Sequence, residues 1–219
     1  MFLALAGLKS QEPPTFISPI GGEMRLSGTF GELRSNHFHT GIDIKSRNGR
    51  GGDPILAAAD GYIERIRISA VGYGRALYIA HPNGYSTVYA HLDRFHPSFE
   101  ERIRGYQQKH QTSKFDLYPL EESWCVAQGD TIGFMGNSGS SAGPHLHYEV
   151  RHTHTEAPVN PLRWSFPYQN GSKPYARKLT LYQLGDEGEI ILEKNYELEN
   201  HMGHFKPRGG KIRVPAGRY

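Results

Sequence analysis

The stretch that decides the fold runs from Leu77 to His91 and has the sequence LYIAHPNGYSTVYAH. Its two ends are rich in β-branched and aromatic residues, and Leu77 and Ile79 alternate with their neighbours as in a half-buried strand. The Asn83-Gly84 step between the ends is a strong hairpin signal, because both residues accept the positive φ of a tight primed turn. We therefore predict an antiparallel β-hairpin.

A β pattern extends over about residues 37–92, and the composition suits a folded β protein. Of 219 residues, 37% are hydrophobic and 21% are charged, which is enough to bury a core and too apolar for a disordered tail. The 26 glycines and 14 prolines supply the many turns that short strands require. We predict a mainly β fold.

The charge balance limits the classes of partner. The chain has 25 Lys and Arg against 22 Asp and Glu, which gives a net charge of +3 and a pI near 8.9. This excess is small and not clustered, so it excludes a strongly basic nucleic-acid-binding arm but is compatible with an anionic cell-wall polymer. No apolar run approaches the ~18–20 residues of a membrane span. We expect no nucleic-acid partner and no transmembrane span.

The first residues indicate export. Residues 1–8, MFLALAGL, are a short apolar run, and a polar, proline-rich break follows in 9–14. A complete signal peptide has a charged start, a longer apolar stretch and a small-residue cleavage site. We interpret residues 1–17 as the remnant of a signal peptide with its linker; the alternative is a start that is apolar by chance. The expected location is the periplasm, cell envelope or extracellular space.

A helix is predicted within residues 93–124, where the β pattern breaks. Ser98 and Glu101 have the spacing of a capping box, and apolar residues recur on one helical face from Phe99 onward. We predict a helix over about 98–111, inserted between two β segments.

The C-terminal part has strand character of its own. Strands are predicted over 178–182, 189–193 and from 211 to 214. We therefore divide the chain into a main domain over 18–165 and a C-terminal β segment over 166–219. This segment either packs on the main domain or is part of an incomplete further domain.

The candidate chemistry lies in the histidines, of which the chain has 12. His145 and His147 stand two apart in a predicted strand, so both rings project from one face while Leu146 points into the core. His39 and Asp43 stand four apart and also share a face of an extended segment. Each pair alone is weak, because exposed surface residues give the same spacing.

A third element is His91, at the end of a predicted strand and on the face of Tyr89. Alone it suits a structural hydrogen bond as well as catalysis. Two histidines and an aspartate together would supply the three protein ligands of a catalytic zinc site, which keeps one position for water. Such an ion lowers the pKa of water from ~15.7 to about 7, and the remaining histidines would act as general base or oxyanion donors.

These motifs resemble those of the lysostaphin-type (LytM-like) zinc metalloendopeptidases, which cut peptide bonds in bacterial peptidoglycan. The His-x-x-x-Asp motif of that family stands at 39–43, its Tyr-x-His-Leu at 89–92 and its His-x-His at 145–147. The three motifs occur in the family's order, and the resemblance covers roughly 18–165.

The resemblance implies a compact antiparallel β peptidase domain of the duplicated hybrid motif type, with loops that wall a narrow cleft. It also implies one Zn²⁺ ion. The expected ligands are His39, Asp43 and His147. His91 and His145 are the expected catalytic pair, one activating water and the other stabilising the oxyanion; the sequence leaves open which does which.

The implied activity is hydrolysis of peptide bonds in peptidoglycan cross-links. Tyr73 and Asn137 are expected to line the substrate groove, and the segment 93–124 is either a wall of the cleft or a solvated insertion. The alternative function is that of a catalytically inactive relative that binds the wall or activates a hydrolase. The filled ligand and catalytic positions favour the enzyme, and a regulatory protein partner stays open.

The sequence also gives expectations for five residues outside these motifs. His37 would contact the metal site from outside if it shares a face with His39. Glu149 would orient a ligand or be solvated. His152 and His154 are expected to be exposed, and Cys125 is expected to be a small buried hydrophobic residue, not a nucleophile.

Overall fold

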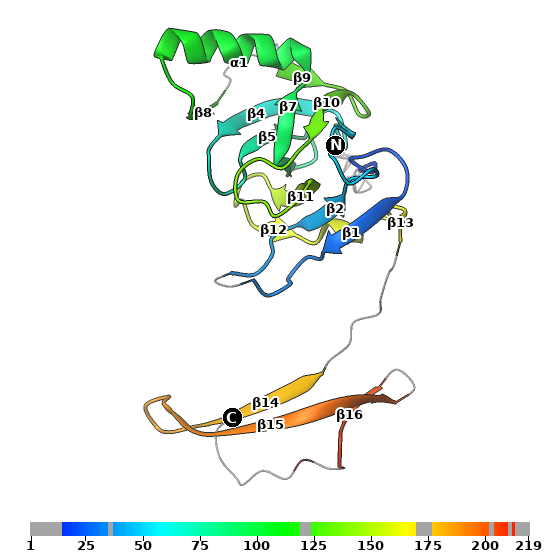
Figure 1. The fold of residues 1–219 in the computed structure, drawn as a ribbon, viewed down its shortest axis with the longest axis vertical. Coiled ribbons are helices and arrows are strands. Elements are labelled where there is room, and N and C mark those ends of the chain that lie inside the picture. Colours follow the sequence, from blue (N-terminus) through cyan, green and yellow to red (C-terminus); the bar gives the residue numbers. More distant parts are fainter. Residues whose placement is uncertain are drawn as a thin grey trace, which may run out of the picture. The chain divides into compact units, whose positions relative to one another are not determined.

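The computed structural model describes residues 15–34, 37–118, 124–169, 177–201, 204–209 and 212. They fall into two compact units, one within 15–169 and the other within 177–212 (Figure 1). The described part of the first unit consists of largely antiparallel sheets with one α-helix, and β13 pairs with β1 in parallel; the second unit is a small antiparallel sheet. The predicted mainly β class is therefore confirmed.

The first unit has these elements in chain order: β1 (Met24–Gly28), β2 (Ile42–Lys45), β3 (Pro54–Leu56), β4 (Gly61–Ile68), β5 (Arg75–Ala80), β6 (Tyr85–Ala90), β7 (Leu92–Phe95), α1 (Pro97–His110), β8 (Phe115–Leu117), β9 (Cys125–Val126), β10 (Thr131–Met135), β11 (His145–His152), β12 (Pro158–Val159), the 3-10 helix η2 (Pro161–Arg163) and β13 (Tyr168–Gln169). The large sheet has the order β13-β1-β2-β11-β6-β5-β4-β8, with β12 beside β11 and β9 beside β4. A second sheet has the order β3-β10-β7.

The core lies between these two sheets. Strand β11 shows how the alternation works, since Leu146, Tyr148 and Val150 are fully buried in the core. Burial of an aliphatic side chain such as Leu146 or Val150 contributes about 1.5–3 kcal/mol. The intervening residues of β11, among them His145 and His147, therefore lie on the opposite face of the sheet.

The predicted hairpin is confirmed as β5 and β6, but its turn differs from the two-residue primed turn expected. The N–H of His81 donates to the carbonyl of Tyr85 at 2.9 Å, so the loop has three residues. Only Gly84 in this loop has a positive φ, of 81°, while the side chain of Asn83 accepts the N–H of Tyr85 at 2.8 Å. Pro82 favours a type I turn, which a left-handed glycine then closes.

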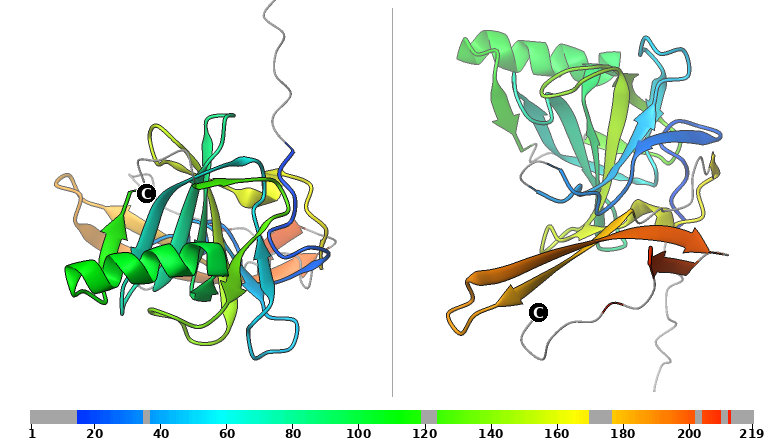
Figure 2. Two further views of the ribbon diagram at one scale, coloured as in Figure 1. Left: turned by 90° about the horizontal axis from the view of Figure 1, so that it is seen from above. Right: turned by 60° about the horizontal axis from the view of Figure 1, so that its bottom comes forward.

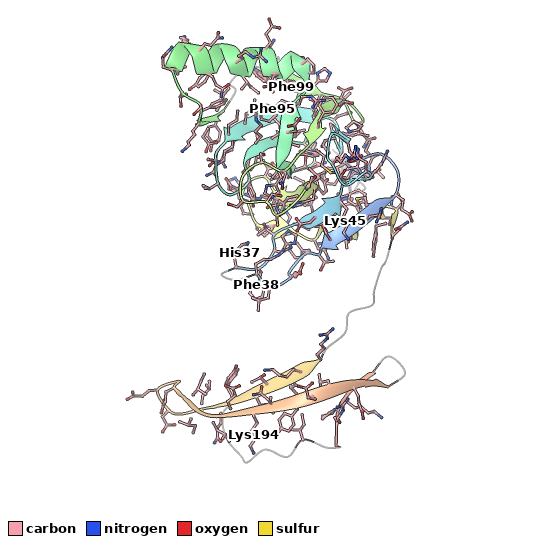
Figure 3. All side chains as sticks on the ribbon, in the orientation of Figure 1. His37, Phe38, Lys45, Phe95, Phe99 and Lys194 are labelled. Carbon is pink, nitrogen blue, oxygen red and sulfur yellow. The ribbon has the colours of Figure 1, made fainter. Side chains whose placement is uncertain are left out.

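Helix α1 begins one residue earlier than predicted and has a different N-cap. His96, not Ser98, is the N-cap residue, and Pro97 occupies the first helical position, where its missing N–H costs nothing. The expected capping box is therefore wrong. Ile103 is fully buried, and Phe95 and Phe99 lie where the helix meets β7 (Figure 3). The helix lies at the end of the unit away from β1 and β2 (Figures 1 and 2).

The second unit comprises β14 (Lys178–Leu184), β15 (Ile190–His201) and β16 (His204–Pro207), paired in that order. The strands predicted over 178–182 and 189–193 correspond to β14 and β15. Of the third predicted strand, from 211 to 214, the structure describes only Ile212, which is outside any strand.

The interpretation of residues 1–17 as a signal-peptide remnant falls mainly on residues 1–14, which lie outside the described residues. Among the residues that the structure does describe, no helix is both long and apolar enough to cross a membrane.

Candidate metal centre and catalytic cleft

Three buried side chains converge on one point of the large sheet. Asp43 of β2 is paired in register with His147 of β11, and His39 lies just before β2. The Nε2 atom of His39 is 3.1 Å from Asp43 Oδ1 and 3.0 Å from His147 Nδ1, and the latter atom is 3.0 Å from Asp43 Oδ1. Two ring nitrogens and one carboxylate oxygen can therefore bind a single metal ion.

Packing of β2 explains why these side chains face outward from the core. Ile42 and Ile44 are fully buried, so the alternation of the strand turns Asp43 to the opposite face. Gly41 allows the segment to approach β11 closely, because a Cβ atom there would lie 2.3 Å from the carbonyl oxygen of Tyr148. The absence of a side chain at Gly41 thus allows the residue before β2 to lie against the backbone of β11, two residues from Asp43.

Hydrogen bonds outside the centre orient two of its side chains. His39 donates from Nδ1 to the carbonyl oxygen of Thr29 at 2.8 Å, which leaves the lone pair of Nε2 directed at the centre. Asp43 accepts a hydrogen bond on Oδ2 from the guanidinium of Arg34 at 2.8 Å, so Oδ1 is the oxygen that faces the two histidines. Such outer contacts fix tautomer and orientation in metal sites.

The third side chain is held by a buried carboxylate. His147 donates from Nε2 to Oε1 of Glu149 at 2.7 Å, and Glu149 is fully buried. The same oxygen accepts hydrogen bonds from the hydroxyls of Thr40 and Tyr73, and Oε2 accepts one from Nε of Arg151 at 2.6 Å. Of the two expectations for Glu149, the structure supports the orienting role.

The charges at the centre are strongly coupled. Burial opposes ionisation of Asp43, but its contacts with His145, His147 and His39, which donate to the carboxylate when these rings are protonated, outweigh it and lower the pKa of the carboxyl. Burial likewise opposes protonation of His147, yet its contacts with Asp43 and Glu149 raise its pKa to about 8. A buried anion surrounded by imidazoles is an arrangement that a cation stabilises.

His91 is brought to the cleft by an unusual backbone conformation. It lies between β6 and β7 with a φ of 61°, which is rare for residues other than glycine. The expected shared face with Tyr89 is wrong, because Tyr89 is buried in the core and its hydroxyl accepts the N–H of Ala58. The ring of His91 instead donates from Nδ1 to the carbonyl of Ser138 at 2.8 Å.

His145 lies beside His91, with 4.8 Å between the two ring centroids. It donates from Nδ1 to the carbonyl of Gly143 at 2.8 Å, and its Nε2 atom is 3.6 Å from Asp43 Oδ1. Burial lowers the pKa of His91 to about 4. At His145 burial also lowers the pKa, but the contacts with Asp43 and Gly143 outweigh it and raise the value.

These groups lie in a cavity of about 370 Å³. The lining residues are Arg34, His37, His39, Asp43, Gly72, Tyr73, His91, Ser140, Ser141, Ala142, His145 and His147. The cavity therefore contains every predicted metal-binding and catalytic residue, and also Tyr73. Asn137 is exposed and is not among its lining residues.

Two other expectations concern the surroundings of the cavity. His37 is an exposed lining residue on the loop between β1 and β2, where Figure 3 labels it next to Phe38. Within the segment 93–124 the structure describes 93–118 and 124, and none of these residues lines the cavity, so the structure does not place α1 as a wall of it.

The remaining sequence expectations have mixed outcomes. His152 and His154 are exposed, as predicted. Cys125 is exposed as well, so the expected burial is wrong. The reason is alternation, because Trp124 and Val126 are buried and the residue between them points outward.

Sequence reasoning missed Arg34, Thr40 and Arg151. Arg151 could have been found from the alternation of β11, since it shares a face with His147 and Glu149. Arg34 reaches Asp43 through the fold of the β1–β2 connection, which no residue spacing reveals.

Comparison with known families identifies the domain. The model of peptidase family M23 matches residues 37–108 and 110–161, which is more than half of the chain. The chain belongs to peptidase family M23. The resemblance to the lysostaphin-type peptidases is thereby confirmed, and the matched M23 region includes all the residues that form the metal centre.

Three curated relatives illustrate the range of the similarity. The DD-carboxypeptidase/endopeptidase Mpg of Neisseria meningitidis serogroup B is 36% identical over 148 residues, 65% of this chain and 27% of that protein. The peptidoglycan DD-endopeptidase ShyC of Vibrio cholerae is 35% identical over 125 residues, covering 57% and 22%. The murein hydrolase activator NlpD of Escherichia coli is 31% identical over 142 residues, covering 65% and 29%. The chain thus spans less than a third of the length of each.

Proposed function

We propose that the chain is a zinc-dependent endopeptidase that hydrolyses peptide bonds in bacterial peptidoglycan cross-links, with the peptidase domain over residues 18–165. The observation that carries this proposal is the convergence of His39, Asp43 and His147 beside two further imidazoles in one cavity. Membership of family M23 supports the peptidase chemistry. The peptidoglycan DD-endopeptidase named among its relatives supports the substrate class.

The donor set suits zinc. His39, Asp43 and His147 would hold the ion with two imidazole nitrogens and a carboxylate oxygen, which is a usual set for a catalytic zinc site. Both rings donate their N–H groups away from the centre, so each offers it a lone pair. When bound, zinc supplies an activated water at neutral pH and polarises the scissile carbonyl.

His91 and His145 are proposed as the catalytic pair. Each gives its Nδ1–H to a backbone carbonyl, of Ser138 and Gly143 respectively, so Nε2 of each ring is left for the reaction. One of the pair, neutral, would take a proton from the attacking water on Nε2, and the other, protonated on both nitrogens, would donate a hydrogen bond from Nε2 to the tetrahedral oxyanion. Tyr73, whose ring stacks on His147 at 5.2 Å, borders the same groove.

The competing proposal is a catalytically inactive protein that binds the wall or activates a hydrolase, a class represented among the relatives by NlpD. The three metal-binding side chains and the two further imidazoles are all present in one cavity, and a binding module has no physical need for them. The filled site therefore favours the enzyme.

The decisive experiment combines metal analysis of the purified protein with digestion of purified peptidoglycan and mass identification of the fragments. We expect about one zinc per chain and release of cross-link peptides, which also identifies the scissile bond. Bound zinc without any cleavage would support the inactive alternative. A wild-type protein that binds no zinc would defeat the proposed function.

The same proposal implies a location outside the cytoplasm. Peptidoglycan lies in the cell envelope, so a hydrolase of its cross-links has to be exported to the periplasm or the cell surface. The relatives whose names refer to peptidoglycan and murein support this location. Fractionation of the producing cells, with the protein detected by antibody, tests it.

A further inference from the structure

The buried carboxylate of Glu149 is not one of the three metal-binding groups, yet it is the most heavily hydrogen-bonded side chain beside them. We infer that Glu149 is a positioning residue that fixes the tautomer of His147 and so presents Nδ1 of that ring to the metal. This inference deepens the proposed function and rests on it. Glu149 is outside the group of three side chains that can bind the metal, and its carboxylate contacts that group at Nε2 of His147.

The first step of the argument is the direction of one hydrogen bond. An ionised carboxylate can only accept, and the His147 ring faces two of them: Glu149 Oε1 lies 2.7 Å from Nε2, and Asp43 Oδ1 lies 3.0 Å from Nδ1. The contact with Glu149 is the shorter one and Glu149 is fully buried, so the single proton of a neutral ring is assigned to Nε2. The lone pair of a neutral ring is then on Nδ1, which is the atom 3.0 Å from Asp43 Oδ1 and 3.0 Å from His39 Nε2. The ring nitrogen that faces the centre is thus the one able to coordinate.

The second step is a contrast with the neighbouring rings. His39, His91 and His145 each donate from Nδ1 to a backbone carbonyl oxygen, and Nε2 is the nitrogen left over. His147 instead donates from Nε2, and its partner is the side chain of Glu149. A side-chain partner can be changed by mutation, so the tautomer of His147 is open to a direct test.

The third step explains why an amide cannot replace the carboxylate. Oε2 of Glu149 accepts from Arg151 Nε at 2.6 Å, and a guanidinium can only donate. The hydroxyls of Thr40 and Tyr73 on Oε1 can donate or accept. In a Glu149→Gln variant, Arg151 would therefore retain the amide oxygen, and the amide NH₂ would point at Nε2 of His147.

That orientation of the amide favours the opposite tautomer of His147. With a donor facing Nε2, His147 would keep its proton on Nδ1 and direct an N–H at the metal position. We expect Glu149→Gln to weaken zinc binding by about 10–100-fold, the effect usual for loss of an orienting partner. The double variant Glu149→Gln/Arg151→Met frees the amide to turn its oxygen toward His147, and it should recover part of this loss.

The experiment reads the tautomer directly, in the metal-free protein. Ring ¹H–¹⁵N correlation spectra of ¹⁵N-histidine-labelled protein distinguish Nδ1–H from Nε2–H in neutral rings, and they are recorded at about pH 9.5, well above the ordinary histidine pKa of about 6.5. We expect Nε2–H in the wild type and Nδ1–H in Glu149→Gln. Glu156→Gln is the matched control, because the exposed Glu156 carboxylate contacts the same Arg151 at 3.3 Å. Zinc affinity is measured in parallel by competition with a chelator.

The outcomes separate the two proposals. An Nδ1–H ring at His147 in the wild type would overturn the inference, and so would a Glu149→Gln variant that keeps the wild-type tautomer and affinity. The wild-type spectrum decides the matter even where the variant does not fold. Failure of the wild type to bind zinc would defeat the proposed function instead, while the tautomer would still report on Glu149.

Discussion

His91 donates from Nδ1 to the carbonyl oxygen of Ser138 at 2.8 Å, and it does so from a left-handed backbone conformation with a φ of 61°. A regular continuation of β6 would direct the ring into the core beside Tyr89. The positive φ directs it instead to His145, with 4.8 Å between ring centroids. Strained conformations of this kind persist where the surrounding structure enforces them, and they concentrate at functional sites.

Replacement of His91 should separate chemistry from metal binding. We expect His91→Ala to lower kcat/KM for peptidoglycan-derived peptides by about 10²–10⁴-fold, the usual contribution of a positioned acid or base. Zinc content should stay near one per chain, because His91 is outside the three-residue centre. Peptide hydrolysis followed by chromatography, together with metal analysis, measures both. Full activity in the variant would exclude His91 from the catalytic pair.

Replacement of His147 should instead remove both properties. His147→Ala deletes one of three ligands, so we expect no bound zinc and no hydrolysis of wall peptides, with the far-UV circular dichroism retained. Treatment of the wild type with a chelator should give the same loss, reversed by added zinc. His154→Ala, at an exposed histidine, is the control. Hydrolysis by a zinc-free His147→Ala protein would contradict the mechanism.

The parts of the fold and site that the sequence predicts are those governed by local periodicity. Alternation in β11 places His145 and His147 on one face and Leu146 on the other, and the structure agrees. The hairpin is predictable because Gly84, whose φ is positive, stands in the turn between two β-rich runs. Alternation alone could not show that β2 and β11 are neighbours; the order of the motifs indicated it only through the family resemblance.

The errors arise where a single residue departs from periodicity or where contacts are distant in sequence. The φ of His91 reverses the face that alternation assigns to it. The N-cap of α1 is His96, because Pro97 occupies the first helical position and takes precedence over the Ser98 spacing. Arg34 reaches Asp43 only through tertiary structure, so neither composition nor spacing could predict that contact.

Arg34 itself should affect metal affinity. Its guanidinium holds Oδ2 of Asp43 at 2.8 Å and leaves Oδ1 for the centre. We expect Arg34→Met to weaken zinc binding by about 10–100-fold, because the carboxylate loses the partner that orients it. Chelator competition measures the change, with the exposed Arg25 replaced by Met as a control for loss of charge. Equal affinities in both variants would show that Arg34 has no orienting role.

Two glycines should respond to alanine with opposite signs. Gly41→Ala places a methyl group 2.3 Å from the backbone oxygen of Tyr148, and relief of that overlap should cost at least about 1–3 kcal/mol of stability. Gly105 lies within α1 with open space around it, so Gly105→Ala should stabilise by about 0.5–1 kcal/mol through helix propensity. Urea unfolding followed by circular dichroism measures both. A neutral Gly41→Ala variant would refute the close approach of β2 and β11.

Stability should fall in mild acid because of His81, which is remote from the metal centre. Its ring is buried between the carbonyl of Asp60 and the hydroxyl of Thr87, each at 2.8 Å. Burial lowers the pKa of His81 below its ordinary value of 6.5, although the hydrogen bond to Asp60 partly offsets this. As the pH falls through about 6.5, the unfolded chain therefore takes up a proton before the folded chain does.

The sign of the effect follows from this difference in proton binding. The contribution of His81 to the free energy of unfolding is full above about pH 6.5 and decreases below it, by at most about 1.4 kcal/mol per pH unit, until the folded-state pKa is reached. We expect His81→Gln to lack this decrease, so its unfolding free energy should depend less steeply on pH between about 7 and 5. Urea unfolding of the zinc-free proteins over that range tests it, with His154→Gln as the exposed control. Parallel profiles for the wild type and His81→Gln would show that His81 is not the group responsible.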